Sequence, residues 1–385
     1  PDPAYWCEHG YAVVNVDARG AFMSEGDVHF WGSQDGRDGY DVVEWLASQE
    51  WSNGKVGFAG NSWLAIAQWF IAAERPPHLA AIAPWEGLTD IYRYDVCRGG
   101  IPDTGFMERT IDGTCGNGRV EDPPSMLRSY PLMNDYWRDK AARVEEIEVP
   151  AYVVGSWTNP VHSYGTLQGF ERLGCRDKWL RVHNTMEWPD FYAHQDDLRL
   201  FFDRYLKDVD NGWEGTPRVR LSVLDPGGRD VVERPEEAFP LTRTQYRPLY
   251  LDATGGPVRG AGDAGGTCST GLPTQEGTAS YPAGNEEGRA VFIYTFDRDT
   301  ELAGHLKLKL WVEVEDADDM DLFVKVQKLS RRGRLLFSST VPVPSRLMRR
   351  VLPILFRRGK KELGLLFFTG PDGRLRVSRR ALDPV

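Results

Sequence analysis

The sequence predicts an α/β domain with a mostly parallel sheet, followed by a β-sandwich. In the first half, short apolar runs alternate with segments of helical spacing, which is typical of a parallel sheet covered by helices. One of these runs enters a Gly-x-Ser turn and then a helix. After Asp208 the helical patterns stop, and short strand-like runs separated by turns indicate a sandwich. With 385 residues, the chain has room for two to three domains.

The first part of the α/β region reads as strand, helix, strand, helix and strand. Residues 10–16 form an apolar, β-branched run that suits a buried strand, and residues 35–49 have apolar side chains at helical spacing. Residues 55–59 form a second strand pattern, and residues 61–73 look helical. A further strand at 80–84 closes this block.

The α/β pattern is interrupted and then resumes. Residues 93–148 contain many Gly and Pro pairs and one helical stretch at 135–144, so we expect an inserted cap there. Strands at 149–155 and 179–182 and a helix at 195–206 complete the α/β unit.

The C-terminal part has the pattern of short strands joined by loops. Strands are expected at 219–224, 249–252, 291–296 and 306–314, the last because leucine and lysine alternate cleanly. Residues 255–288 are rich in Gly, Ala and Thr and are expected to form a loop.

These patterns predict four segments of domain organisation. Residues 1–92 form the first part of the α/β core, 93–148 the cap, 149–212 the second part of the core, and 213–385 a jelly-roll-like sandwich. The chain enters a strand pattern within about ten residues of Pro1 and stops just after strand-like sequence. We therefore expect it to be a piece of a longer protein, with both domains truncated.

Composition excludes several classes of function. The 56 acidic residues against 46 basic ones give a net charge of −10, so there is no global basic field for nucleic acid. The five cysteines are an odd number without a Cys-x-x-Cys pair, which indicates reduced thiols instead of a disulfide framework or a zinc site. No apolar run reaches the ~18 residues of a membrane helix, and no signal peptide opens the chain. We expect no membrane span, no metal or organic cofactor, and a cytoplasmic location.

One basic stretch stands apart from the acidic chain. Residues 346–361 hold seven basic residues and no acidic one, interleaved with apolar side chains. Such a stretch can lie on a membrane surface, but Pro353 interrupts it, and we interpret it as a solvated insertion in the sandwich.

The sharpest chemical signal is the segment Gly57-Phe58-Ala59-Gly60-Asn61-Ser62-Trp63-Leu64. A strand that turns sharply into a helix holds a serine Oγ above the sheet, and the next backbone N–H, of Trp63, points at a developing oxyanion. Leu64 stands where such motifs usually have a second glycine. Ser62 is therefore a candidate nucleophile, and the alternative is an ordinary helix N-cap.

Around this motif the chain resembles the cocaine esterase / X-prolyl dipeptidyl peptidase family of serine hydrolases. The resemblance rests on a series of blocks in the same order along the chain: residues 10–14, 17–20, 24–26, 38–45, 51, 57–68, 81–84, 90–92, 201–207, 218–224 and 319–323. It implies an α/β-hydrolase fold, a C-terminal jelly roll and a triad in the chain order Ser, Asp, His.

Two members of the implied triad differ in this sequence. The family's acid lies in a Gly-Trp-x-Asp loop, and the matching text Gly155-Ser156-Trp157-Thr158-Asn159 places Asn159 at its position. The family's histidine follows the next strand, and Glu187 occupies that position. The nucleophile matches and its two partners do not.

Several residues remain candidates for the general base. Imidazole suits the task because its pKa lies near neutrality. His183, at the end of a strand, is preferred, and His162, three residues after Asn159, is the alternative. Asn159 could orient either imidazole by accepting its N–H. Glu187 could act as the base itself if burial raised its pKa.

The resemblance implies hydrolysis of an ester or amide through an acyl-enzyme on Ser62, with Trp63 supplying one oxyanion donor. The second donor in the family is a tyrosine on an early loop, which would lie before Pro1. The substrate could be an acyl ester, an amino-acid ester or an X-Pro peptide, and the sequence does not choose among them or decide whether the chain forms a homo-oligomer. The rival hypothesis, motivated by Asn159 and Glu187, is a degenerate hydrolase that acts as a binding or scaffold protein.

Overall fold

The computed structural model describes residues 2–114, 116, 118–256, 264–284, 288–340 and 367–380. It divides into two compact units. The first comprises Pro1–Glu237, Leu310–Lys328 and Leu335–Val385, and the second comprises Ala238–Lys309 and Leu329–Arg334. The basic stretch at 346–361 lies outside the described residues, so its predicted role stays a prediction.

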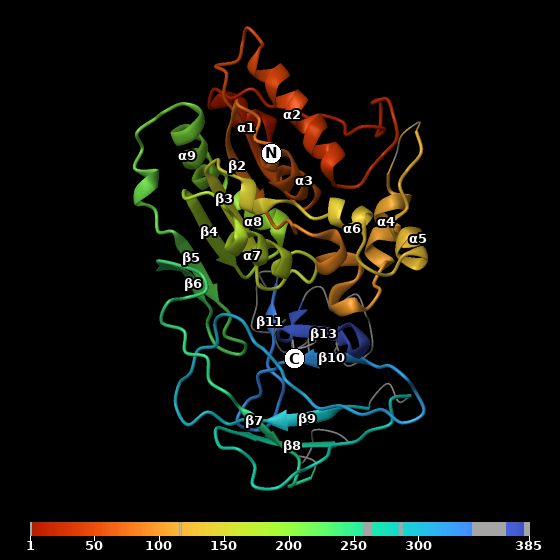
Figure 1. Ribbon diagram of the computed structural model, residues 1–385. Helices are drawn as coiled ribbons and strands as arrows, with labels where there is room; N and C mark the ends of the chain where they lie inside the picture. The colour runs from red at the N-terminus through yellow and green to blue at the C-terminus, as the bar shows by residue number, and fades with distance from the viewer. Residues whose placement is uncertain are drawn as a thin grey trace. The chain divides into compact units, whose positions relative to one another are not determined.

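A six-stranded sheet forms the centre of the first unit (Figure 1). Its strands lie in chain order, and the first five are parallel while the sixth is antiparallel to the fifth. The strands are β1 (Val56–Asn61), β2 (Leu79–Trp85), β3 (Ala151–Ser156), β4 (Lys178–His183), β5 (Val219–Val223) and β6 (Val231–Glu236). All six residues of β3 and all but the first of β4 are buried, as expected for strands with helices on both faces.

An aromatic core fills one face of this sheet. Alternate residues of β2 and β3 point to this face and pack against helix α9 (Gln195–Leu206). The buried cluster contains Trp6, Ala81, Ala83, Trp85, Tyr152, Val154, Trp179, Phe191, Leu198, Phe201, Phe202 and Trp213. It contains four of the 13 tryptophans of the sequence.

Helices α3 (Trp63–Ala73) and α7 (Ser163–Arg172) cover the opposite face. Val154 of β3 packs in the aromatic cluster, so the next residue, Gly155, faces the opposite side of the sheet. Thr166 of α7 lies against Gly155 on that side. Gly169 of α7 lies close to the Trp69 ring of α3, so the two helices are neighbours. Helix α2 (Ser33–Ala47) packs on α3 from outside.

Short helical segments connect β2 to β3, in the part of the chain predicted as a cap. They are η1 (Tyr92–Val96), η2 (Arg98–Gly100), α4 (Gly105–Asp112), α5 (Pro123–Ser129), α6 (Asp135–Asp139) and η3 (Val144–Glu146). The helix predicted at 135–144 ends at Asp139, and the side chain of the next residue, Lys140, donates to the backbone oxygen of Phe30 and to Glu121.

Two predicted strands are wrong. Residues 10–16 have no regular secondary structure, and Val14 and Val16 are 44% and 57% exposed. Residues 306–314 form no strand either, and the alternating leucines at 306, 308 and 310 are exposed. No described strand pairs with either segment. A strand-like pattern of apolar residues forms a strand only where a neighbouring strand supplies hydrogen bonds and an apolar layer covers its apolar side chains.

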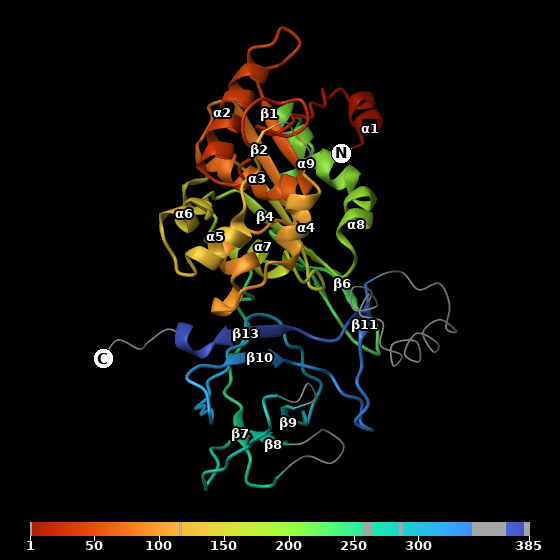
Figure 2. The same cartoon turned by 90° about the vertical axis from the view of Figure 1, so that its right-hand side faces the viewer.

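The C-terminal part contains small sheets (Figure 2). In the second unit β7 (Tyr250–Asp252), β8 (Ala264–Ser269) and β9 (Ala290–Ile293) form one sheet, so β8 occupies part of the predicted 255–288 loop. In the first unit β10 (Asp321–Lys325) pairs with β13 (Asp372–Arg376), and β11 (Ser338–Ser339) pairs with β12 (Phe367–Phe368).

The fifth strand of the main sheet was expected in the sandwich and lies elsewhere. Val219, Arg220 and Leu221 of β5 pair in parallel with β4, so the α/β sheet continues past the predicted boundary at 212/213. Over the part of the chain that the structure describes, no helix is both long and apolar enough to cross a bilayer.

Candidate active site

The side chains of the candidate site follow the carboxyl ends of adjacent parallel strands. Ser62 follows β1 and Glu86 follows β2. Asn159 and His162 lie in the loop after β3, and Glu187 follows β4. Ligands of open α/β sheets bind at this edge, because the carboxyl ends of parallel strands all open on the same side.

Ser62 lies at a strained turn between β1 and α3. Its φ of +56° is in the left-handed region, which non-glycine residues rarely adopt. Gly60 precedes it with φ of +147°, and a Cβ added to Gly60 would lie 2.6 Å from the Cβ of Leu64. The residue that replaces the usual second glycine thus packs over the first one, and the turn is retained.

Trp63 is the first residue of α3. The backbone N–H groups of the first helical turn have no partner within the helix, and they lie at the positive end of the helix dipole. This N–H is therefore a suitable oxyanion donor next to Ser62.

His162 is the histidine that meets the serine. Its Nε2 lies 3.0 Å from Ser62 Oγ, and the residue is 4% exposed. Burial lowers the pKa of His162 to about 4, so the imidazole is neutral at pH 7. No described residue accepts a hydrogen bond from Nδ1. The pair is therefore a Ser–His dyad without a carboxylate on the second nitrogen.

Asn159 connects this dyad to two carboxyl groups. Its Nδ2 lies 2.7 Å from Oε2 of Glu86 and 2.9 Å from Oε2 of Glu187, and donates to both. Its Oδ1 accepts from the backbone N–H groups of Val161 and His162, at 3.0 and 3.1 Å. Asn159 thus holds the backbone that carries His162 and, in the described structure, makes no hydrogen bond to the imidazole, in contrast to the predicted orientation by N–H acceptance.

Glu187 and Glu86 form a close carboxyl pair around that amide. Burial, followed by the charge of Glu86, raises the pKa of Glu187 to about 7. Asn61, the last residue of β1, donates to the backbone oxygen of Glu187 at 3.1 Å. No hydrogen bond joins the Glu187 carboxylate to Ser62 in the described structure.

His183, the preferred base in the sequence analysis, lies elsewhere in this group. Its Nε2 is 2.7 Å from Oε1 of Glu86, and its Nδ1 is 3.1 Å from the hydroxyl of Thr185. Of the two histidines, His162 and not His183 thus lies within hydrogen-bond distance of Ser62. His183 ends β4 with its side chain on Glu86, whereas the loop after β3 folds back and brings His162 to Ser62.

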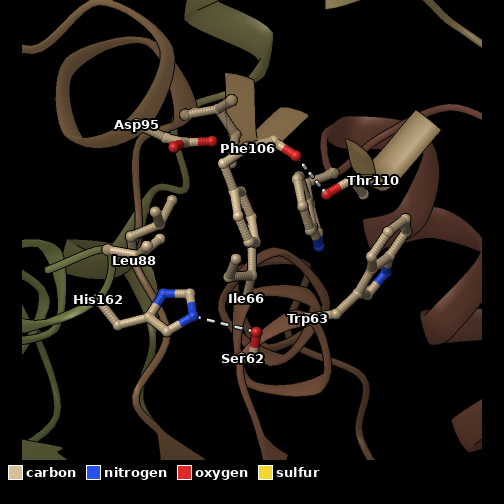
Figure 3. Close-up of a pocket in the computed structure, with 11 residues that line it drawn as sticks. Ser62, Trp63, Ile66, Leu88, Asp95, Phe106, Thr110 and His162 are labelled. Atoms are coloured by element: carbon tan, nitrogen blue, oxygen red, sulfur yellow. Dashed lines mark hydrogen bonds between the residues drawn. The ribbon is translucent and has the colours of Figure 1, made fainter. Parts of the chain in front are cut away.

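A pocket opens above the dyad (Figure 3). Helical segments of the cap provide one wall, and the region around α3 provides another. Its apolar lining consists of Trp31, Trp63, Ile66, Leu88, Ile91, Phe106 and Val161, and its polar lining of Ser62, Asp95, Thr110 and His162.

Two residues of this region, Glu86 and Asp95, are not among the site residues that the sequence predicts. Glu86 follows a buried strand directly and is 1% exposed with φ of +53°, so its place after a strand was a usable signal. Asp95 lies in the cap, and no motif in the sequence marks it.

Family models match most of the chain. The model of X-Pro dipeptidyl-peptidase (S15 family) matches residues 2–130, and the model of the X-Pro dipeptidyl-peptidase C-terminal non-catalytic domain matches residues 211–384. The second match begins close to the predicted boundary at 212/213, although β5 pairs with the α/β sheet.

Matches to individual proteins support the same family. Cocaine esterase of Rhodococcus is 28% identical over 71% of this chain and 57% of its own length. A Mycobacterium bovis protein provisionally named a serine esterase is 37% identical over 85% of this chain and 67% of its own length. The crystal structure of a CocE/NonD family hydrolase from Staphylococcus aureus matches the whole chain with a TM-score of 0.86 at 36% identity.

The chain spans 57% of the cocaine esterase and 64% of the staphylococcal structure. These matches show an α/β-hydrolase domain followed by the C-terminal non-catalytic domain of the same family. Their names are those of esterases and peptidases, as the resemblance in the sequence implied. The chain belongs to the cocaine esterase / X-Pro dipeptidyl-peptidase family of α/β-hydrolases.

Proposed function

We propose that the protein is a serine hydrolase that cleaves an ester or amide through an acyl-enzyme on Ser62, with His162 as general base. The observation that carries the proposal is the 3.0 Å distance between Ser62 Oγ and His162 Nε2. It places a neutral imidazole within reach of the hydroxyl proton.

The geometry supports an ordinary acyl-transfer sequence. Ser62 Oγ attacks the carbonyl carbon while its proton moves to Nε2 of His162, and the oxyanion receives the N–H of Trp63. Collapse of the tetrahedral intermediate breaks the bond to the leaving alcohol or amine, which takes the proton from His162. Water then attacks the acyl-enzyme, gives its proton to His162, and the second collapse returns the proton to Ser62 and releases the acid.

The dyad predicts a slower enzyme than a complete triad. Imidazolium forms at His162 in both tetrahedral intermediates, and burial without an acceptor at Nδ1 disfavours that charge. The carboxylates of Glu86 and Glu187 are held by Asn159 instead. Replacement of the acid in a complete triad lowers kcat by about 10⁴-fold. We expect the kcat of the dyad to be lower than that of a complete triad by up to a similar factor.

Glu187 is the second candidate base, because its raised pKa of about 7 suits a general base. It stands at the position of the family's histidine. His162 is favoured over it by the hydrogen bond to Ser62, which Glu187 lacks in the described structure.

The decisive experiment is labelling with a fluorophosphonate probe, which reacts with activated serines, in the longest natural form of the chain. Ser62→Ala should abolish labelling, while Ser163→Ala, which changes the half-buried first residue of α7, should leave it intact. Absence of Ser62-dependent labelling would contradict the proposal and favour a degenerate hydrolase that acts as a binding protein.

A further inference from the structure

We infer that Glu86 is a positioning residue for the proposed dyad: its backbone oxygen holds the turn of Ser62, and its carboxylate holds the loop of His162 through Asn159. The inference rests on the proposed function and names the residue that fixes how its two reacting groups meet.

The backbone of Glu86 lies between the strands that carry the serine and the histidine. Glu86 follows β2, and its backbone oxygen accepts the N–H of Ser62 at 3.2 Å. Its own N–H donates to the backbone oxygen of Val154 in β3 at 2.7 Å. Its φ of +53° is rare for a residue other than glycine, and such backbone strain concentrates at functional sites. Glu86 is thus fixed by its main chain to both neighbouring strands.

The side chain of Glu86 reaches the loop of His162 through one amide group. Oε2 of Glu86 accepts from Nδ2 of Asn159 at 2.7 Å. An ionised carboxylate only accepts hydrogen bonds, so the NH2 group of Asn159 faces Glu86 and Oδ1 faces the loop. There Oδ1 accepts the backbone N–H groups of Val161 and His162, directly before α7. The carboxylate therefore sets the orientation of the amide, and the amide holds the backbone that carries the imidazole.

A second donor faces the other oxygen of Glu86. Nε2 of His183 lies 2.7 Å from Oε1, and Nδ1 of the same ring accepts the N–H of Thr185 at 3.3 Å. The ring proton is therefore on Nε2 and faces Glu86. Glu86 is 1% exposed, and a carboxylate so deeply buried requires donors that replace its hydration. His183 and Asn159 supply one donor to each oxygen.

These contacts predict an effect on catalysis through position. Glu86 is bonded to the turn of Ser62 by its backbone and to the loop of His162 by its side chain. In the described structure its carboxylate makes no hydrogen bond to Ser62 or to the imidazole of His162. A displacement of about 1 Å between reacting groups can lower a rate by about 10²-fold. We therefore expect loss of the carboxylate to lower kcat and to leave KM nearly unchanged.

Glu86→Gln tests the inference, because it exchanges one acceptor oxygen for an NH2 group of nearly the same shape. The remaining oxygen would face the N–H of His183, and the new NH2 group would meet the NH2 group of Asn159. Asn159 would then turn away and release the N–H groups of the loop. We expect kcat for an activated ester to fall by about 10²-fold while KM changes less than about threefold.

Asp203→Asn is the matched control. Asp203 is also a buried carboxylate, 9% exposed, and it accepts hydrogen bonds from Tyr11 and Lys207 instead of from residues of the site. This variant should lower the free energy of unfolding in urea and leave kcat unchanged. It therefore separates the effect of position from a general loss of stability.

Glu86→Gln/Asn159→Asp reverses the polarity of the contact and should recover activity. The NH2 group at position 86 would donate to the carboxylate at position 159, whose other oxygen would again accept the backbone N–H groups. At pH 6, below the pKa of Glu187 of about 7, protonated Glu187 can donate to that carboxylate as well. The double variant should then have a kcat about tenfold above that of Glu86→Gln, since residues in contact are not additive. Asn159→Asp alone should show no such gain over the wild type.

Histidine NMR separates this inference from the proposed catalysis. In protein with ¹⁵N-labelled histidine, the shift of Nε2 of His162 reports the hydrogen bond from Ser62, and His162→Gln assigns the resonance. Ser62→Ala gives the shift of the broken contact. Glu86→Gln should move the resonance most of the way to that value, and Asp203→Asn should leave it at the wild-type position. The measurement requires no hydrolysis, so it tests the positioning even if the chain cleaves no ester.

Three results would overturn the inference. The first is a Glu86→Gln variant with wild-type kcat, the second is a fall in kcat without movement of the Nε2 resonance, and the third is a double variant no more active than Glu86→Gln. If Glu86→Gln does not fold, the double variant decides. A wild-type Nε2 shift in the double variant supports the inference, and the shift of Ser62→Ala contradicts it.

Discussion

Nε2 of His162 lies 3.0 Å from Oγ of Ser62, although 100 residues separate them in the chain. The contact forms because β1 and β3 flank β2 in the parallel sheet, and each strand ends in a loop at the same edge. The family resemblance implies a triad in the chain order Ser, Asp, His, so the role of His162 as base is a proposal that the following experiments test.

His162→Gln should lower kcat by about 10² to 10⁴-fold, the range that a positioned general base contributes. His183→Gln is the comparison, because that imidazole contacts Glu86 instead of Ser62 and should affect kcat much less. Steady-state kinetics with an activated ester measures both, and circular dichroism confirms that both variants are folded. A larger loss in His183→Gln than in His162→Gln would contradict the assignment.

The pH profile distinguishes the two candidate bases. A base works only in its deprotonated form, so kcat/KM should be constant around neutrality and fall tenfold per pH unit below the pKa of His162, about 4. If Glu187 were the base, the fall would begin near its pKa of about 7. The measurement is the rate of fluorophosphonate labelling at each pH, with the protein exposed to that pH only briefly. The rate of labelling should follow the same pH dependence as kcat/KM.

Burial of neutral His162 also predicts a loss of stability in acid. The unfolded chain binds the proton near the ordinary pKa of 6.5, whereas the folded protein resists it until about 4. The free energy of unfolding should therefore decrease as the pH falls through this window. Urea denaturation of wild type and His162→Gln should show a steeper decrease in the wild type, and parallel curves would contradict this explanation.

Asn159→Asp should not restore a triad. Nδ2 of Asn159 donates to Glu86 and Glu187, and an aspartate there would place a third carboxyl between them. We expect a loss of about 3 kcal/mol in the free energy of unfolding at pH 8, since a buried charge would lose its partners. The loss should shrink at pH 5.5, which lies below the raised pKa of Glu187, about 7, so that this carboxyl group takes up a proton. Asn159→Ser removes the donor without adding charge, and an equal, pH-independent loss in both variants would contradict this account.

Gly60→Ala should disturb the turn that holds Ser62. An added Cβ would lie 2.6 Å from the Cβ of Leu64, and the φ of +147° is unfavourable for alanine. Thermal denaturation and labelling should both show the damage. Gly60→Ala/Leu64→Gly removes the steric conflict and should recover part of the loss, and no recovery would assign the whole effect to backbone strain.

Local patterns in the sequence determined the order of the α/β elements. The apolar runs at 55–59, 80–84, 149–155 and 179–182 correspond to β1 to β4. The last three of these strands are almost wholly buried, and strands buried on both faces are continuously apolar. The helix at 195–206 coincides with α9. The order strand, turn and helix around Ser62 also follows from residues that are close together in the chain. The same residues make Ser62 a candidate nucleophile.

The tertiary structure determined which segments and which side chains are neighbours. Residues 10–16 and 306–314 have strand-like sequences and form no strand, since a ladder needs a neighbour that local sequence does not specify. The choice between His162 and His183 depended on how two loops fold over the sheet edge, and both histidines lie at similar distances in sequence from the mismatched positions. The positioning role inferred for Glu86 depends on the fold for the same reason, because its partners Asn159 and His183 lie at the ends of other strands. The sequence by itself thus determined the family and the candidacy of Ser62, while long-range packing determined which groups surround Ser62.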